Sequence, residues 1–395
     1  MSTKEETMTK AIITPLFFLC SLLLGLGTQS GRDEISKVNL NTPIRVLLDK
    51  GSQELSIKSV AHDMYGKDDG AGGWIKFSKA VSIKLSKDKT SIIINDIPFP
   101  SKAVYLRGGP HPMDKLQYKT DLYRGALKVA FIEKGLLVTN VLPLEDYLQG
   151  MLGGEMSPTW EMEALKAQSV ASRTYALYMI HHPKSSYYDL EKGTGDQVYN
   201  GANAESERAR KAVDATRGQY LTMKSQPIKS YFHSRCGGLT ETAKTVWKFN
   251  EKGNQSRVPC TFCQKFPYVW KSAVKARDLL SFLKLPFAEA SPFKVTVAER
   301  SPSGRVGSVK IQSGGQEKLI NSDELRSLLG YTKVKSTRFD WKIQGRDIEF
   351  EGVGSGHGVG MCQWGARFLA QSGKNYRQIL SHYYPSAEFN WKSKP

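Results

Sequence analysis

The stretch GEMSPTW at residues 154–160, with the segment 161–180 that follows it, decides the fold. Ser157 can cap a helix and Pro158 suits a first helical position, and the acidic residues that come next favour the positive end of a helix dipole. Small and apolar side chains then recur at helical spacing, which predicts a helix packed closely in a core. We expect Glu155 just before this helix, in an exposed turn where its carboxyl group can face a cleft.

The residues around Glu155 leave its role open. A loop glutamate ahead of an amphipathic helix is common and need have no function. Lys166 and Arg173 are seven residues apart and therefore lie on one face of the predicted helix. They either form salt bridges at the edge of the core or bind an anionic group, and spacing alone does not separate these alternatives.

Composition gives the class of protein and limits its partners. The 395 residues are 40% hydrophobic and 24% charged, which is ordinary for a globular chain of one large or two modest domains. A formal net charge of +18 predicts attraction to polyanions: nucleic acid, an anionic membrane surface or an acidic cell wall. Because no nucleic-acid-binding module stands out in the sequence, we expect no nucleic-acid partner.

The N-terminus indicates the compartment. Lys4 and Lys10 precede an apolar run at 11–26, and small residues follow it. This run is short for a membrane span, so residues 1–30 are predicted to be a secretory signal peptide and the protein to be exported, to the periplasm, the cell wall or the medium. An uncleaved signal anchor is the alternative and the one expected route to a membrane. A lipoprotein site at Cys20 is disfavoured, because bulky residues precede it.

Periodicity predicts an α+β fold with two regions. Residues 31–140 are expected to be mainly β, because alternating and β-branched runs separated by turn residues fill 44–141. A mixed α/β core follows at 141–390, and 44–140 is expected to be continuous with it. Within the core, 274–351 alternates short helices and strands and offers no constellation of catalytic residues.

One histidine and three cysteines form a candidate metal site. His233-x-x-Cys236 and Cys260-x-x-Cys263 offer four ligands of the kind that bind structural zinc tetrahedrally. Outside the cytoplasm cysteines tend to oxidise, so a disulfide from Cys236 to Cys260 or Cys263 is a second possibility, and free thiols are a third. In each case the expected role is to join two loops rather than to perform chemistry.

A glycine-rich segment at 352–365 predicts a tight loop pressed against another part of the protein. A phosphate-binding loop is disfavoured, because the segment lacks the Lys-Ser/Thr ending of that motif. His357 and Gln363 are candidate hydrogen-bonding groups in this segment. For His357 the alternative is a structural histidine bonded to the backbone.

Two long runs resemble one known family. LPLEDYLQGMLGGEMSPTWEMEALKAQSVASRTYAL at 142–177 and GVGSGHGVGMCQWGARFLAQSGKNYRQILSHYYP at 352–385 resemble signatures of the stage II sporulation protein D family, which includes the amidase-enhancer proteins. Weaker similarity extends the resemblance over about 44–385. It implies a secreted lytic transglycosylase that cleaves peptidoglycan glycan strands, with a substrate groove in the core and the family's catalytic acid falling on Glu155.

The resemblance also implies which residues bind substrate. The matching positions are Lys166, Arg173, Gln197, Tyr199, Ser234, His357 and Gln363. Some relatives carry Cys and His metal ligands ahead of the Gln-Val-Tyr block, but this chain has neither residue at 191–196, so no cofactor is expected for catalysis. Cys362 stands where relatives often have serine, which indicates tolerated packing rather than a nucleophile.

A single acid suits the implied chemistry. Hydrolysis of a glycosidic bond usually takes two carboxyl groups. In a lytic transglycosylase the C6 hydroxyl of N-acetylmuramic acid instead attacks its own C1 and leaves a 1,6-anhydro end. Glu155 must then be protonated near neutral pH, and burial against Met156 and Trp160 is expected to raise its pKa. The fold could still bring in Asp196 or Glu241 as a second carboxyl group.

The amidase-enhancer relatives give a second hypothesis, a non-catalytic wall-binding activator of an N-acetylmuramoyl-L-alanine amidase. The presence of Glu155, Lys166 and Arg173 favours the enzyme. The expected partners are therefore peptidoglycan glycan strands, preferably without stem peptides, and an amidase under the second hypothesis.

Overall fold

The structure, a computed structural model, describes residues 43–69, 72–99, 101–111, 114–287 and 293–391. The predicted signal peptide and Cys20 lie outside these residues. Among the residues described, no helix has both the length and the apolar character needed to cross a membrane.

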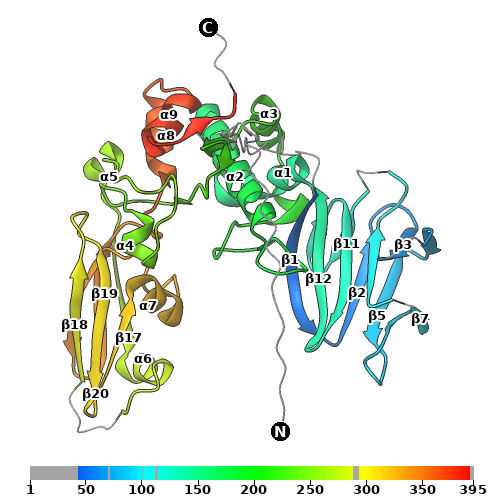
Figure 1. The fold of residues 1–395 in the computed structure, drawn as a ribbon, viewed down its shortest axis with the longest axis horizontal. Coiled ribbons are helices and arrows are strands. Elements are labelled where there is room, and N and C mark those ends of the chain that lie inside the picture. The colour runs from blue at the N-terminus through cyan, green and yellow to red at the C-terminus, as the bar shows by residue number, and fades with distance from the viewer. Residues whose placement is uncertain (1–42, 70–71, 100, 112–113, 288–292, 392–395) are drawn as a thin grey trace, which may run out of the picture. The chain divides into compact units, whose positions relative to one another are not determined.

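The N-terminal region consists of two sheets of mainly antiparallel strands, as its sequence pattern predicts (Figure 1). One sheet has the strand order β13-β1-β12-β11-β8-β3-β4. Its strands are Leu190–Glu191 (β13), Pro43–Ser52 (β1), Gly135–Pro143 (β12), Ala126–Ile132 (β11), Ala103–Arg107 (β8), Met64–Asp68 (β3) and Ile75–Phe77 (β4). The other has the order β10-β9-β2-β5-β6-β7. Its strands are Asp121–Tyr123 (β10), Leu116–Tyr118 (β9), Glu54–Ser59 (β2), Ala80–Leu85 (β5), Ile92–Ile94 (β6) and Ile97–Phe99 (β7). Strand β2 buries every second side chain, which is the alternation expected when one face of a sheet covers a core.

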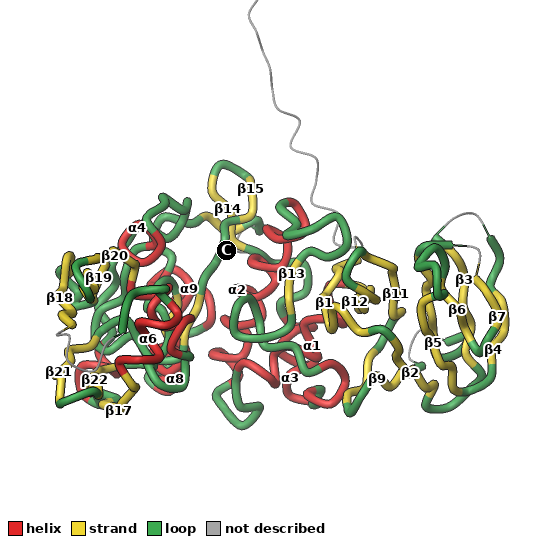
Figure 2. Tube along the Cα trace, turned by 90° about the horizontal axis from the view of Figure 1, so that it is seen from below, coloured by secondary structure: helices red, strands yellow, loops and turns green. Residues whose placement is uncertain are grey.

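Helix α2 (Met162–His181) is the helix that the deciding stretch predicts, displaced by one residue. It contacts four other helices, which surround it in Figures 1 and 2. They are α1 (Leu144–Glu155), α3 (Glu207–Ala215), α8 (Gln363–Gln371) and α9 (Tyr376–Tyr383). Most side chains of α2 are buried, and many are small, so neighbouring backbones can approach it closely.

Short elements connect these helices to the rest of the chain. They are the 3-10 helix η1 (Gly201–Ala204), the strands β14 (Leu221–Met223), β15 (Gln226–Pro227), β16 (Phe232–His233), β23 (Met361–Cys362) and β24 (Glu388–Phe389), and the helices α4 (Ala243–Trp247) and α5 (Thr261–Lys265). Strands β16 and β23 are parallel and pair His233 with Cys362. This pairing brings the start of α8 against the loop that follows β16.

Residues 269–353, which we call the inserted lobe, have a hydrophobic cluster of their own. The lobe contains two three-stranded sheets, β17-β22-β21 and β18-β19-β20, with helices α6 and α7. The bounds are Val269–Lys275 (β17), Ala276–Phe282 (α6), Phe293–Arg300 (β18), Val306–Ser313 (β19), Gln316–Asn321 (β20), Ser322–Leu329 (α7), Phe339–Gln344 (β21) and Asp347–Val353 (β22).

The α+β prediction is confirmed. The larger hydrophobic cluster runs from Ile44 to Tyr384 and draws on both predicted regions, 44–140 and 141–390. The smaller cluster, from Trp270 to Phe350, lies inside the range that the sequence predicts as one core. Sequence periodicity does not reveal this division, because both clusters use the same apolar residue types.

Candidate functional site

Glu155 lies at a helix end rather than in a turn. It is the last residue of α1, so the expectation of an exposed turn before α2 is wrong. Ser157 does not cap α2: Glu161 is at the N-cap position, and Ser157 instead shares a hydrogen bond of 2.8 Å with Thr159. The run of glycines that resembles a turn is the last part of α1.

Those glycines let another segment lie against α1. A Cβ atom on Gly150 would come within 2.6 Å of the Gly201 carbonyl oxygen, and one on Gly154 within 2.7 Å of the Val198 oxygen. A Cβ on Gly153 would overlap the Ala204 oxygen outright. The glycine face of α1 therefore admits the backbone of 198–204, which a larger side chain would push away.

This close approach gives the Glu155 carboxyl group its first partner. The backbone N–H of Val198 donates to Oε1 at 2.6 Å. The second partner is Gln363, at the start of α8, whose Nε2 lies 3.3 Å from Oε2 and 3.2 Å from the carbonyl oxygen of Glu155. The carboxyl group is half-buried, and burial raises its pKa to about 7 against these two opposing hydrogen bonds. The expected rise in the pKa of Glu155 is thus confirmed.

Two residues predicted to bind substrate instead hold the Val198 backbone in place. Gln197 is fully buried, accepts a hydrogen bond of 2.8 Å from Tyr147, and donates to the Ser172 carbonyl at 3.3 Å. Tyr199 is also buried, and its hydroxyl donates to Asn140 at 2.6 Å. Neither side chain reaches solvent, so both have a supporting role in this structure, and their contact with substrate stays a prediction.

Arg173, also predicted to bind substrate, has a structural role in the fold. Its side chain is completely buried and forms a two-pronged ion pair with Glu145, in which Nε and Nη2 each lie 2.8 Å from a carboxylate oxygen. Lys166 is partly exposed and pairs with Glu163 at 2.7 Å. Neither cation contacts Glu155 among the interactions of the described residues, which agrees with a Glu155 pKa that is raised rather than lowered.

The two candidate second carboxyl groups are engaged elsewhere. Asp196 accepts from Tyr175 at 2.7 Å and pairs with Lys184 at 2.6 Å. Glu241 is fully buried and pairs with Arg257 at 2.7 Å, and its other oxygen accepts from two serine hydroxyls. Glu155 therefore remains the candidate acid, and burial raises its pKa to about 7.

An aromatic platform adjoins Gln363, and the sequence analysis did not predict it. It consists of Trp160, Phe262 and Trp364, all partly exposed, together with Arg235 and Arg367. The Trp364 ring lies 5.0 Å from that of Trp160 and stacks at 5.6 Å on that of Phe262. Arg235 lies 4.0 Å above the Trp364 ring centre, and Arg367 spans both tryptophans. Aromatic faces with guanidinium groups suit sugar rings that carry carboxylates.

The glycine-rich segment is the tight loop that its sequence predicts. Gly354, Gly356, Gly358 and Gly360 have positive φ values, and a Cβ on Gly360 would overlap the Tyr231 carbonyl oxygen. Nδ1 of His357 accepts from the Val359 N–H at 3.1 Å, and loss of hydration lowers the pKa of His357 to about 3. A neutral, backbone-bonded ring favours the structural alternative for His357. Ser234 is half-exposed, and its carbonyl oxygen accepts a hydrogen bond of 3.2 Å from the backbone N–H of Trp364.

The structure brings three of the four predicted metal ligands together, and a further cysteine joins them. Cys236, Cys260 and Cys263 come together with Cys362, and their four sulfur atoms lie within 4.8 Å of one another. His233 is not in this group, and Nδ1 of its ring bonds the Val359 carbonyl at 3.0 Å. Cys362, expected to be tolerated packing, takes the place assigned to His233.

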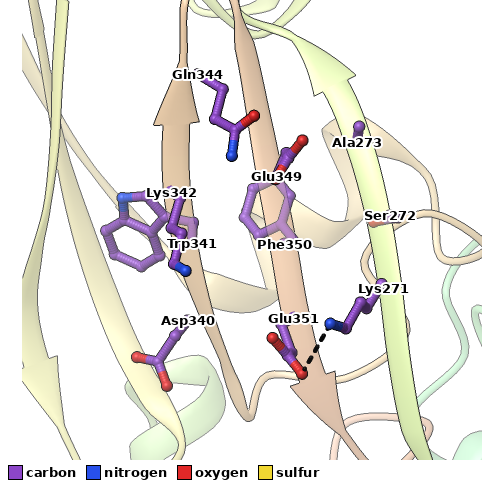
Figure 3. Close-up of a pocket in the computed structure, with 10 residues that line it drawn as sticks. All are labelled: Lys271, Ser272, Ala273, Asp340, Trp341, Lys342, Gln344, Glu349, Phe350 and Glu351. Carbon is purple, nitrogen blue, oxygen red and sulfur yellow. Dashed lines mark ion pairs between the residues drawn. The ribbon is translucent and has the colours of Figure 1, made fainter.

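A separate cavity of about 460 Å³ lies on the β17-β22-β21 sheet of the inserted lobe (Figure 3). Its lining includes Trp341 and Phe350 among charged residues, and Lys271 pairs with Glu351 at 3.5 Å. None of the predicted site residues lines it. It therefore offers no support for the chemistry at Glu155.

Comparison with known proteins identifies the family to which this chain belongs. A family model described as stage II sporulation protein matches residues 132–223, which include Glu155 and Val198. An uncharacterised protein of Brachyspira hyodysenteriae is 36% identical over 264 residues, which are 66% of this chain and 70% of that protein. The chain belongs to the stage II sporulation protein D family. A second model, for a domain of unknown function, matches 246–360 and so covers the inserted lobe of this family member.

Two named relatives from Bacillus subtilis (strain 168) show the range of the family. Stage II sporulation protein D is 29% identical over 272 residues, which are 63% of this chain and 75% of that protein. The amidase enhancer is 31% identical over 284 residues, which are 60% of this chain and 39% of that protein. One of these relatives is thus named for sporulation and the other for enhancing an amidase.

Proposed function

We propose that this protein is an exported lytic transglycosylase that cleaves the bond between N-acetylmuramic acid and N-acetylglucosamine in peptidoglycan, on strands that lack stem peptides. The observation that carries the proposal is the Glu155 carboxyl group. The group is half-buried, and its pKa is raised to about 7. It accepts a hydrogen bond from the side-chain amide of Gln363, which directly precedes Trp364 of the aromatic platform. Near neutral pH, a large fraction of such a group is protonated and able to act as an acid.

One carboxyl group is enough for this reaction. Glu155 gives its proton to the bridging glycosidic oxygen, and the bond from that oxygen to C1 of the muramic acid breaks. Positive charge develops at C1, and the C6 hydroxyl of the same sugar attacks it while the Glu155 carboxylate takes the hydroxyl proton. The strand ends in a 1,6-anhydro ring, no water is consumed, and Glu155 is protonated again. The Val198 and Gln363 donors stabilise the carboxylate between the two proton transfers.

The decisive experiment uses purified glycan strands in water enriched in oxygen-18. A transglycosylase gives anhydro ends without the label, whereas a hydrolase gives labelled reducing ends. Glu155→Gln is expected to abolish the products while the circular dichroism spectrum is unchanged. Glu163→Gln is the control, since Glu163 pairs with Lys166 on α2. Equal turnover by the Glu155→Gln and unmodified proteins would refute the catalytic assignment.

The second candidate function is activation of an amidase, and similarity to the amidase enhancer favours it. A protein acting in this way would raise the rate of an N-acetylmuramoyl-L-alanine amidase on intact wall, and Glu155→Gln would leave that effect in place. The net charge of +18 supports binding to an acidic cell wall under either function.

A further inference from the structure

Four buried sulfur atoms meet where three distant parts of the chain converge. They belong to Cys236, Cys260, Cys263 and Cys362, and the sulfur atoms of Cys263 and Cys362 lie 3.6 Å apart. Zinc bound tetrahedrally to four thiolates at about 2.3 Å places the sulfurs about 3.8 Å apart. The cluster therefore needs only a slight contraction to surround one ion.

The groups around the sulfurs suit thiolates. The Gly238 N–H donates to Cys236 at 3.3 Å, and the Tyr383 hydroxyl lies 3.6 Å from the Cys260 sulfur. A Cβ on Gly365 of α8 would lie 2.6 Å from that sulfur, so this helix packs directly on the cluster. Such N–H and O–H donors orient metal-bound sulfur and stabilise its negative charge.

A buried cation beside the cluster makes no direct ion pair among the described residues, although the Glu241 carboxylate acts on it electrostatically. Arg305 is fully buried, and its Nη2 donates to the Cys236 carbonyl at 2.5 Å. Its Nε has no hydrogen-bond partner, and Arg305 is absent from the ion pairs of the described residues. A buried charge without an ion pair is costly. One zinc ion with four thiolates carries a net charge of −2 and would compensate it.

We propose that the four cysteines bind one zinc ion, and that this ion fixes the start of α8, from which the amide of Gln363 reaches Glu155. Cys362 directly precedes Gln363, and Cys362 is also paired through β23 with β16. Holding its sulfur thus fixes the backbone that carries the amide. Cys362 is therefore a positioning residue. Only the importance for turnover of this connection from the zinc site through Gln363 to Glu155 rests on the proposed function.

The first test counts metal and thiols in the full protein, exported by its host and purified without chelators. We expect one zinc per chain, and complete alkylation of all four cysteines after denaturation with a chelator. Cys362→Ser should lose the zinc, and His233→Asn should keep it, because an asparagine amide can replace the imidazole donor to Val359. Disulfides, metal-free thiols, iron in place of zinc, or zinc lost with His233→Asn but kept with Cys362→Ser would overturn the proposal.

A second measurement guards against a Cys362→Ser protein that does not fold. In the unmodified protein, cobalt substituted for zinc should give the intense thiolate charge-transfer absorption and the visible bands of a tetrahedral four-sulfur site. Spectra of an octahedral ion would contradict the ligand set. This readout needs no variant and no enzymatic turnover.

The positioning role is tested by carbon-13 NMR titration of the Glu155 carboxyl group, assigned with Glu155→Gln. Removing the ion should raise the Glu155 pKa in the same direction as Gln363→Leu, since both weaken the amide contact. Zinc removal that leaves this pKa unchanged would overturn the positioning role. Because neither test uses glycan cleavage, a protein that cleaves no glycan would refute the proposed function and leave the zinc site to be judged on its own results.

Discussion

Nε2 of Gln363 lies 3.3 Å from Oε2 of Glu155, although 208 positions separate the two residues in the chain. The amide is 6% exposed and lies at the first position of α8, while the carboxyl group ends α1. The other carboxylate oxygen is held by the Val198 N–H. Two donors from different segments therefore oppose the burial that raises the pKa of this acid.

Replacing Gln363 by leucine should raise the Glu155 pKa further, because a donor that stabilises the carboxylate is lost while burial is kept. We expect a rise on the order of one unit, with the basic limb of the pH–activity profile moving upward by the same amount. Gln371→Leu is the matched control, since Gln371 lies on the same helix and donates to the exposed Glu161. A profile that is equally displaced in both variants, or in neither, would contradict the role of Gln363.

The raised pKa also makes a prediction about stability. The folded protein keeps the Glu155 proton up to about pH 7, whereas the unfolded chain loses it near pH 4.5. Between these values the folded state binds more protons, so the contribution of Glu155 is fully present below pH 4.5 and is lost as the pH rises through 7. Glu155→Gln should therefore raise the free energy of unfolding at pH 8 by about 3 kcal/mol relative to its effect at pH 4. Urea denaturation at both pH values measures this difference, with Glu207→Gln, an exposed residue paired with Lys211, as control.

Gly153→Ala should separate α1 from the segment that carries Val198, because the added methyl group would overlap the Ala204 carbonyl oxygen. We expect a loss of about 1–3 kcal/mol in the free energy of unfolding, as for other overpacked sites. Gly195→Ala serves as control, since a Cβ there meets nothing within 4 Å. Equal stabilities for the two variants would show that the glycine face of α1 is not needed.

Sequence patterns predicted the parts of the fold that depend on local order. The strands of 44–141 and the helix α2 follow from periods of two and 3.6 residues, which any half-buried strand or packed helix must show. The end of α1 was mistaken for a turn, because consecutive glycines usually interrupt helices. Here Gly153 and Gly154 stay helical and serve a close contact with 198–204, which lies too far along the chain for a local rule to detect.

The candidate site was also predicted only in part, because sequence patterns do not show how distant parts of the chain meet. Matching a family pattern placed Glu155 and Gln363 together correctly, but it could not distinguish accessible side chains from buried ones that support the fold, such as Arg173 and Tyr199. A spacing rule found the Cys260-x-x-Cys263 pair. It missed Cys362, which is 99 residues from Cys263 and reaches the cluster only through the pairing of β16 with β23.

Arg173→Met should destabilise the fold and leave substrate affinity unchanged in protein that remains folded. The buried Glu145 carboxylate would lose its ion pair, which typically costs about 3–5 kcal/mol. The double variant Arg173→Met, Glu145→Leu should recover much of that loss, because no unpaired charge is left. Chemical denaturation of the two single variants and the double variant measures the coupling. A single variant of normal stability with a raised KM would instead restore Arg173 to the binding residues.

Trp364→Ala should weaken binding of glycan strands, because it removes the central ring of the aromatic platform and the surface on which Arg235 stacks. Loss of one such stacking surface is expected to cost about 1 kcal/mol, or roughly fivefold in the dissociation constant. Trp341→Ala is the matched control, since Trp341 lines the cavity of the inserted lobe (Figure 3). Glycan affinity is measured by calorimetry on proteins that also carry Glu155→Gln, so that no glycan is cleaved during the titration. If Trp341→Ala lowered affinity and Trp364→Ala did not, the glycan would bind to the inserted lobe, and the platform would have a structural role alone.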